Sequence, residues 1–200
     1  MNDPSNVKEM VEAKPDFMGF IFYPGSTRYV GAEPDSSLFH NVPSGITRVG
    51  VFVNEDKGKI IESALSFGLG MIQLHGNESP EYCSFLRSSG LKIVKAFNVS
   101  KDFDFELARP YISVCDYFLF DTKNEKAGGS GKKFNWQILN RYNLEKPFFL
   151  SGGIGPDDTG MIKVITNRGF FAVDVNSCFE TSPGIKDVKL VKSFIDEIKK

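Results

Sequence analysis

Residues 147–166 read PFFLSGGIGPDDTGMIKVIT, and they contain a short apolar run, a turn rich in glycine and a helical segment, in that order. An apolar run without polar alternation is typical of a strand that is buried on both faces of a parallel sheet. The segment Asp157–Thr166 has the spacing of apolar residues expected of a helix. This stretch therefore predicts one strand-and-helix unit of an α/β fold.

The same unit recurs along the chain, with helical periodicity over Lys57–Phe67, Ser79–Ser88 and Val188–Ile198. The expected strands alternate with helical segments and cover Phe17–Tyr23, Arg48–Asn54, Met71–His75, Leu91–Phe97, Tyr117–Asp121, Pro147–Leu150 and Phe170–Val175. Such alternation favours a parallel sheet. No linker or change of composition interrupts residues 1–200, which predicts a single domain.

The start of the chain predicts a helix rather than a strand. Asp3 suits the cap of a helix, Pro4 its first position, and apolar residues between Val7 and Val11 form one face. Seven expected strands follow, whereas a parallel barrel closes only when every strand edge is paired. We therefore expect a (β/α)8 TIM barrel whose first strand is absent from the sequence and would lie upstream of Met1. An open α/β sheet is the alternative.

Composition excludes several classes of function. The formal net charge is −1, so no basic field indicates a nucleic-acid partner. No apolar run approaches the ~20 residues that span a bilayer, and the first ten residues do not resemble a signal peptide. Cys83, Cys115 and Cys178 lack the spacing of a metal or redox motif. We therefore expect a cytoplasmic protein with free thiols, no bound metal and no membrane partner.

Two turns with small residues follow the last two expected strands. Gly152, Gly153 and Ile154 belong to the first turn, and Ser177 and Cys178 belong to the second. Small residues allow backbone N–H groups to approach an anion closely. A phosphate site after the last two strands is the common arrangement in β/α barrels. The pair of turns predicts a phosphorylated small-molecule ligand, although a glycine turn alone is explained better as a tight connection.

Three polar residues stand at or just after expected strand ends, where β/α barrels carry their working groups. Asp121 ends an apolar strand and suits a general acid, with a turn aspartate as the alternative. The long stretch after it, residues 123–132, suits a lid over the site or a solvated connector. Arg28 could bind a substrate carboxylate, but on these residues alone we favour a surface arginine. For His75 we favour a loop anchor over a catalytic role.

Co-linear motifs over nearly the whole chain resemble the phosphoribosylanthranilate isomerase family. The motifs are Gly19–Tyr29, Val49–Asn54, Gln73–Gly76, Asp121–Thr122 with Gly128–Gly131 and Phe134–Trp136, Leu150–Gly153, and Ala172–Val175 with Ser182–Gly184 and Lys186–Asp187. Each motif alone is weak, but their common order makes chance similarity improbable.

The resemblance implies a reaction and its residues. The family carries out an Amadori rearrangement of an aminoaldose in tryptophan biosynthesis, without metal or organic cofactor. The family's general acid corresponds to Asp121, and its carboxylate-binding arginine corresponds to Arg28. Its phosphate turns correspond to Gly152, Gly153 and Ile154, and to Ser177 and Cys178. An aspartate near the substrate corresponds to Asp174. A monomer or a homodimer is expected.

The sequence departs from the family pattern at three places. The Lys-x-Cys-Gly motif, whose cysteine is the family's general base, is absent from residues 1–200, so this chain is expected to be inactive without it. Cys178 and Asn135 stand where the family usually has glycine and aspartate. Two other interpretations remain open: a phosphate-binding barrel without catalytic activity, and another phosphosugar isomerase such as the histidine-pathway aminoaldose isomerase, which uses two aspartates.

Overall fold

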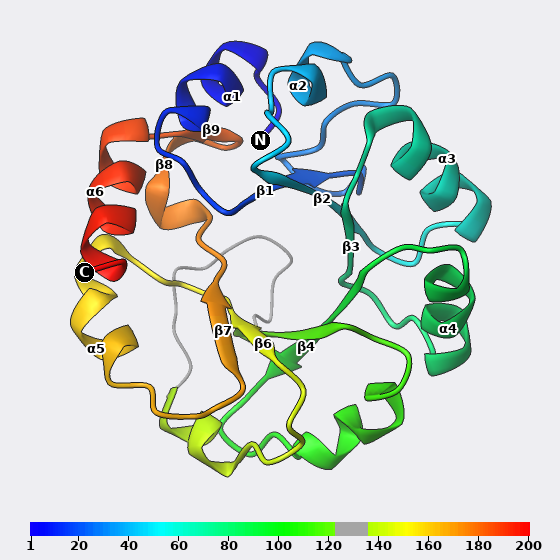
Figure 1. The fold of residues 1–200 in the computed structure, drawn as a ribbon, viewed down its shortest axis with the longest axis vertical. Coiled ribbons are helices and arrows are strands. Elements are labelled where there is room, and N and C mark those ends of the chain that lie inside the picture. Colours follow the sequence, from blue (N-terminus) through cyan, green and yellow to red (C-terminus); the bar gives the residue numbers. More distant parts are fainter. Residues whose placement is uncertain (123–135) are drawn as a thin grey trace.

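The computed structural model describes residues 1–122 and 136–200, which form a curled sheet surrounded by helices (Figure 1). The segment expected to form a lid lies outside the described residues. The sheet strands are β1 (Phe17–Ile21), β2 (Thr47–Phe52), β3 (Met71–Leu74), β4 (Ile93–Val99), β5 (Tyr117–Thr122), β6 (Phe148–Leu150) and β7 (Phe170–Val173). The helices are α1 (Pro4–Val11), α2 (Ser37–His40), α3 (Lys57–Phe67), α4 (Pro80–Ser88), α5 (Thr159–Lys163) and α6 (Val188–Ile198).

The seven strands follow one another in the order β1 to β7, and every neighbouring pair is parallel. The expected barrel order and the expected parallel sheet are therefore confirmed. In the described residues β1 and β7 are the two edges of this sheet and do not pair with each other. Beside this gap, the Met1 amine donates a hydrogen bond to the Gly19 carbonyl of β1 at 2.9 Å.

The helix at the start of the chain is confirmed. The Asp3 carboxylate caps α1 by accepting from the Asn6 amide at 2.7 Å, and Pro4 occupies the first turn. The helix expected over Asp157–Thr166 is shorter than predicted, because a 3-10 turn over Pro156–Asp158 precedes α5. Glycine inside α5 and β-branched residues after it, which are poor helix formers, explain the short length.

One pair of strands was missing from the sequence-based prediction. β8 (Glu180–Ser182) and β9 (Ile185–Lys186) form a small antiparallel hairpin before α6. Its turn includes Gly184, whose φ of +89° lies in the left-handed region that favours glycine. In Figure 1 the hairpin lies beside α1 and the gap between β1 and β7.

The apolar core has two parts. The larger part fills the space between the sheet and the helices and contains stacked aromatic rings such as Phe22, Phe52 and Phe39. The smaller part lies inside the curled sheet and consists of Val49, Met71, Val94, Ala96, Leu119 and Phe149. Edge-on rings of Phe17, Tyr117, Phe149 and Phe171 gather at the amino-terminal side of this interior. The polar residues considered below lie toward the opposite end of the strands.

No helix of the described residues has the length and apolar character needed to cross a membrane.

Candidate active site

A cavity of about 900 Å³ occupies the interior of the curled sheet, and its lining extends from the carboxyl ends of the strands to Asp16 before β1 and to residues of α6. Side chains alternate between the two faces of a strand, so Met71, Gln73 and His75 share the inner face at β3. The same alternation puts Asp121 on the inner face of β5 with Leu119. Polar residues thus collect at one rim, and they are Gln73, His75, Asn98, Asp121, Ser151 and Asp174.

Asp121 lies at this rim, as the sequence predicted. It pairs in register with Asn98 of β4, and its side chain is 22% exposed, so it can meet a ligand in the cavity. Its Oδ2 lies 3.3 Å from Nε2 of His75. A carboxyl group here has a polar neighbour and access to the cavity, which a general acid requires.

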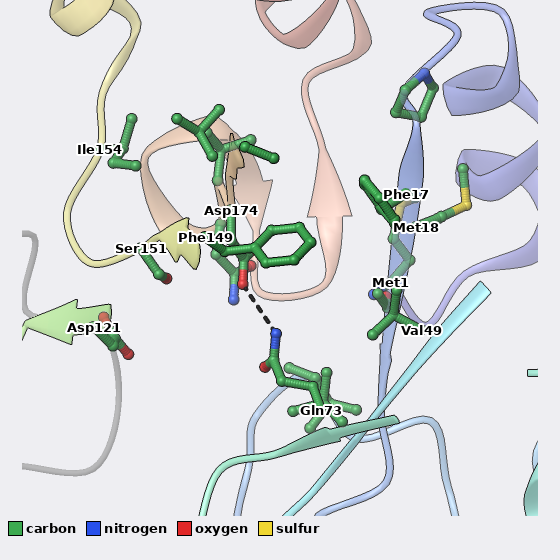
Figure 2. A pocket seen from close by; sticks show the side chains of 18 of the residues that line it. Met1, Phe17, Met18, Val49, Gln73, Asp121, Phe149, Ser151, Ile154 and Asp174 are labelled. Atoms are coloured by element: carbon green, nitrogen blue, oxygen red, sulfur yellow. Dashed lines mark hydrogen bonds between the residues drawn. The ribbon is translucent and has the colours of Figure 1, made fainter. Parts of the chain in front are cut away.

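Asp174 faces the same cavity from the end of β7. Figure 2 shows its side chain joined to Gln73 across the cavity, and Gln73 Nε2 donates to Asp174 Oδ2 at 3.4 Å. Burial raises the pKa of Asp174 above its usual range, and the negative charge of Asp121 raises it further. The structure therefore brings the two predicted aspartates to one site.

The two predicted phosphate turns lie next to each other. Gly152 and Gly153 have φ values of +92° and +68°, a backbone conformation that L-residues other than glycine rarely adopt. The Cys178 thiol of the second turn lies 4.0 Å from the Gly153 carbonyl of the first. Both turns line the cavity, with Ser177 and Ile154 among its lining residues. This arrangement can present backbone N–H groups to an anion.

Arg28 also lines the cavity, but its guanidinium has a partner that the sequence did not reveal. Nε and Nη2 of Arg28 donate to the two carboxylate oxygens of Glu180 at 2.6 to 2.9 Å. Lys186 Nζ donates to Glu180 Oε1 at 3.0 Å. Burial alone would raise the pKa of Glu180, but hydrogen bonds from Arg28 and the charge of Lys186 lower it to about 2. Arg28 is thus held in place by the β8–β9 hairpin.

The structure does not show the His75 side chain in the loop-anchoring contacts for which we favoured it. Glu78 holds that loop instead, because its carboxylate accepts from the backbone amides of Asn54 and Gly76 and pairs with the buried Lys95 at 3.0 Å. The His75 ring contacts Asp121 and the Gln73 side-chain oxygen, which is 3.3 Å from Nδ1. Strand alternation was the signal in the sequence that places Gln73 and His75 on one face.

The cysteines are free thiols, as expected. Cys83 and Cys115 are buried outside the cavity, and Cys178 is half-buried in the second phosphate turn. Among residues 1–122 and 136–200, no group of three or more His, Cys, Asp or Glu side chains is placed to hold a metal ion.

Comparison with known proteins agrees with this geometry. Residues 1–197 match the family model described as N-(5'-phosphoribosyl)anthranilate (PRA) isomerase. An N-(5'-phosphoribosyl)anthranilate isomerase of Phocaeicola vulgatus is 43% identical over 199 residues, covering 100% of this chain and 95% of that protein. The corresponding protein of Parabacteroides distasonis is 42% identical and covers 99% of this chain and 90% of that protein.

Solved structures show the same likeness. A crystal structure of phosphoribosyl anthranilate isomerase from Thermotoga maritima is 36% identical, with a TM-score of 0.85, and covers 100% of this chain and 95% of that chain. The likeness to this family therefore extends over the entire chain and includes the overall fold. This chain belongs to the N-(5'-phosphoribosyl)anthranilate isomerase family.

Proposed function

We propose that the protein is an aldose–ketose isomerase that converts N-(5'-phosphoribosyl)anthranilate to the carboxyphenylamino-deoxyribulose phosphate in tryptophan biosynthesis. One observation carries this proposal: Asp121 and both small-residue turns line a single cavity. A relative that is 33% identical, with a TM-score of 0.82, has been crystallised with reduced 1-(o-carboxyphenylamino)-1-deoxyribulose 5-phosphate. That compound contains the phosphate and the carboxylate that the site would have to hold.

In this proposal Asp121 is the general acid. It donates a proton to the furanose ring oxygen, the ring opens to a Schiff base, and the carbon next to it then loses a proton to a base. A carboxyl group that faces the reacting atoms can supply this proton, provided that it keeps one near neutral pH. Asp174 lies at the same rim, where burial and then the negative charge of Asp121 raise its own pKa.

The remaining predicted residues would bind the two ends of the substrate. The backbone amides of Gly153, Ile154 and Ser177, with the small residues Gly152 and Cys178 beside them, would hold the phosphate. Arg28 would meet the anthranilate carboxylate with the part of its guanidinium that Glu180 does not engage. Two anchors at the ends of the substrate would position the sugar ring near Asp121, which is how binding energy assists the chemical step.

The activity is tested by following the loss of phosphoribosylanthranilate in two preparations. One is residues 1–200, and the other carries in addition an amino-terminal strand with the Lys-x-Cys-Gly motif. Turnover by either preparation supports the isomerase activity, and the comparison shows whether the base comes from that motif. If neither folded preparation turns over the substrate, and neither binds the reduced product analogue in calorimetry, the proposal is wrong.

Two further expectations belong to this proposal. The protein would be a monomer or a homodimer, and the Thermotoga maritima relative is described as a dimeric protein from which monomers were generated. A cytoplasmic location would fit an enzyme of amino-acid biosynthesis. Sedimentation velocity at micromolar concentration distinguishes the two oligomeric states.

A further inference from the structure

Four side chains from three strands of the sheet form a continuous row across the cavity. Asp174 Oδ2 accepts from Gln73 Nε2 at 3.4 Å, and Gln73 Oε1 lies 3.3 Å from His75 Nδ1. His75 Nε2 lies 3.3 Å from Asp121 Oδ2. Figure 2 shows Gln73 and Asp174 reaching toward each other, with Asp121 at the same opening. Gln73 is buried, so its amide is held away from bulk water.

The structure gives the Gln73 amide one orientation in this row, with Nε2 toward Asp174 and Oε1 toward His75. The NH₂ group donates to Asp174 Oδ2, because a carboxyl group offers an acceptor oxygen whether or not it carries a proton. The carbonyl oxygen then faces His75, and a carbonyl oxygen also only accepts. Nδ1 of His75 must therefore carry a hydrogen.

The position of that hydrogen determines what His75 offers to Asp121. In a neutral imidazole with hydrogen on Nδ1, the other nitrogen presents a lone pair. This lone pair faces a carboxylate oxygen at 3.3 Å. Two lone pairs at this distance repel each other, so the contact is favourable only with one proton between the two atoms. The row is thus consistent only with a His75–Asp121 pair that holds a proton.

We propose that Gln73 is a positioning residue that fixes the Nδ1–H tautomer of His75, so that His75 Nε2 and Asp121 Oδ2 share one proton. This proton is the one that Asp121 delivers to the sugar ring oxygen, so the inference rests on the proposed role of Asp121. Delivery breaks the bond between the proton and the pair and forms the O–H bond of the opened sugar. The charge of the pair falls by one unit, while Nδ1–H stays bonded to Gln73.

Charged and polar groups from other elements line the rim around the pair. Asp174 follows β7, and burial and the charge of Asp121 raise its pKa, while the charge of Lys186 of β9 lowers it. Asn98 of β4 and Ser151 after β6 also line the rim, but both are uncharged. The row therefore explains why position 73 is an amide. Gln73 donates to Asp174 and accepts from His75, and His75 in turn contacts Asp121.

The chain allows a direct test, because His40 and His75 are its only histidines. Two-bond proton–nitrogen correlation spectra of the ¹⁵N-labelled chain distinguish the two tautomers of each ring. His75 is expected in the Nδ1–H form, whereas the exposed His40 should show the Nε2–H form that free histidine favours in water. An Nε2–H form of His75 in the unmodified chain would overturn the proposal.

Two variants of matched size test the role of Gln73. Gln73→Leu removes the acceptor and should return His75 to the Nε2–H form, whereas Gln73→Glu keeps an acceptor oxygen and should preserve Nδ1–H. An unchanged tautomer in the folded leucine variant contradicts the proposal. If the leucine variant fails to fold, the unmodified chain and the glutamate variant still decide the matter, since an Nε2–H form in both would exclude it.

A third variant tests the shared proton. In the unmodified chain, the ¹⁵N shift of His75 Nε2 should lie between the values of a bare and a protonated nitrogen. Asp121→Asn should move it to the bare value, and an identical shift in both chains would show that no proton is shared. These spectra do not depend on turnover, so they separate this inference from the proposed activity.

In an active preparation, Gln73→Leu should lower kcat by roughly tenfold with little change in KM. This loss is smaller than the loss of kcat expected for replacing the general acid Asp121 itself.

Discussion

Asp121 is the residue on which the proposed chemistry depends. Asp121→Asn keeps the size of the side chain but removes the transferable proton, so kcat should fall by at least ~10²-fold while KM changes less. Asp102→Asn, on an exposed turn outside the cavity, is the matched control and should leave turnover unchanged. Steady-state kinetics on an active preparation measure both. Near-normal kcat in Asp121→Asn would remove this residue from the mechanism.

The phosphate turns give a second prediction at the scale of single residues. Gly153 has a φ of +68°, and Ser177 lines the neighbouring turn. Replacing both by valine should move the backbone amides and fill the space for the anion, so the Kd for inorganic phosphate should rise at least tenfold, by about 1.4 kcal/mol or more. Gly160→Ala is a suitable control, because a Cβ there would meet no atom within 4 Å.

Calorimetry with inorganic phosphate compares the double variant and the control. Circular dichroism shows whether each is folded, because valine at a positive φ costs roughly 1–2 kcal/mol by itself. Phosphate binding of normal strength in the folded double variant would disprove the assignment of the two turns.

Residues at strand ends were predictable, and residues that act through other side chains were not. Asp121, Asp174 and the turn glycines follow expected strands, so a barrel model alone assigns them to one rim. Glu180 could not be paired with Arg28 from the sequence, because that contact depends on how the end of the chain folds back over the start. Strand alternation puts Gln73 on the inner face, but its partners become visible only with coordinates.

At the scale of elements, the ion pair between Glu180 and Arg28 attaches the β8–β9 hairpin to the loop after β1. Glu180 has a pKa of about 2 in the folded state, against 4.5 for the ordinary group. The folded state therefore binds this proton more weakly than the unfolded state, so the stabilisation is present above pH 4.5 and is lost as pH falls toward 2. The full effect is on the order of 3 kcal/mol as an upper value.

Thermal unfolding followed by circular dichroism between pH 5 and pH 2.5 tests this attachment. The Tm of the unmodified chain should fall more steeply with acidification than that of Glu180→Gln, which has no such proton to bind. Glu106→Gln changes an exposed carboxylate that pairs with Arg109, and it should retain the steep dependence because exposed pairs stabilise little. Equal pH dependence in the unmodified chain and Glu180→Gln would exclude Glu180 as the cause.

The sequence predicts long elements better than short ones. Seven strands could be placed because each contains a short run rich in apolar residues, and segments with helical periodicity lie between several of them. β8 and β9 contain only three and two residues, too few for any periodic pattern to be recognised. Their sole signal was Pro183 with Gly184, which indicates a turn but not the strands beside it. The hairpin nevertheless carries Glu180 and Lys186, so the missed element is one that shapes the rim.

At the scale of the whole molecule, ligand binding should couple the two sides of the rim. In the proposed site, phosphate alone would contact only the turns after β6 and β7, whereas the reduced product analogue would also span the cavity toward Asp121 on β5 and Arg28 after β1. A ligand that binds only the folded state stabilises it by RT ln(1 + [L]/Kd), which is ~2.7 kcal/mol at a concentration of 100 Kd. Both ligands should therefore raise the Tm, and the analogue should do so at a far lower concentration.

The variants make this prediction specific to the proposed site. Substituting valine for both Gly153 and Ser177 should abolish the Tm shift with phosphate and weaken the shift with the analogue. Arg28→Met should leave the phosphate shift intact and reduce only the analogue shift, because the guanidinium would bind the carboxylate end. Glu180 loses its partner in that variant, so each shift must be measured relative to the ligand-free Tm of the same variant. Equal losses with both ligands in Arg28→Met would mean that this arginine holds the rim together and does not bind the carboxylate. A Tm unaffected by either ligand in the unmodified chain would mean that the cavity does not bind a phosphorylated sugar at all.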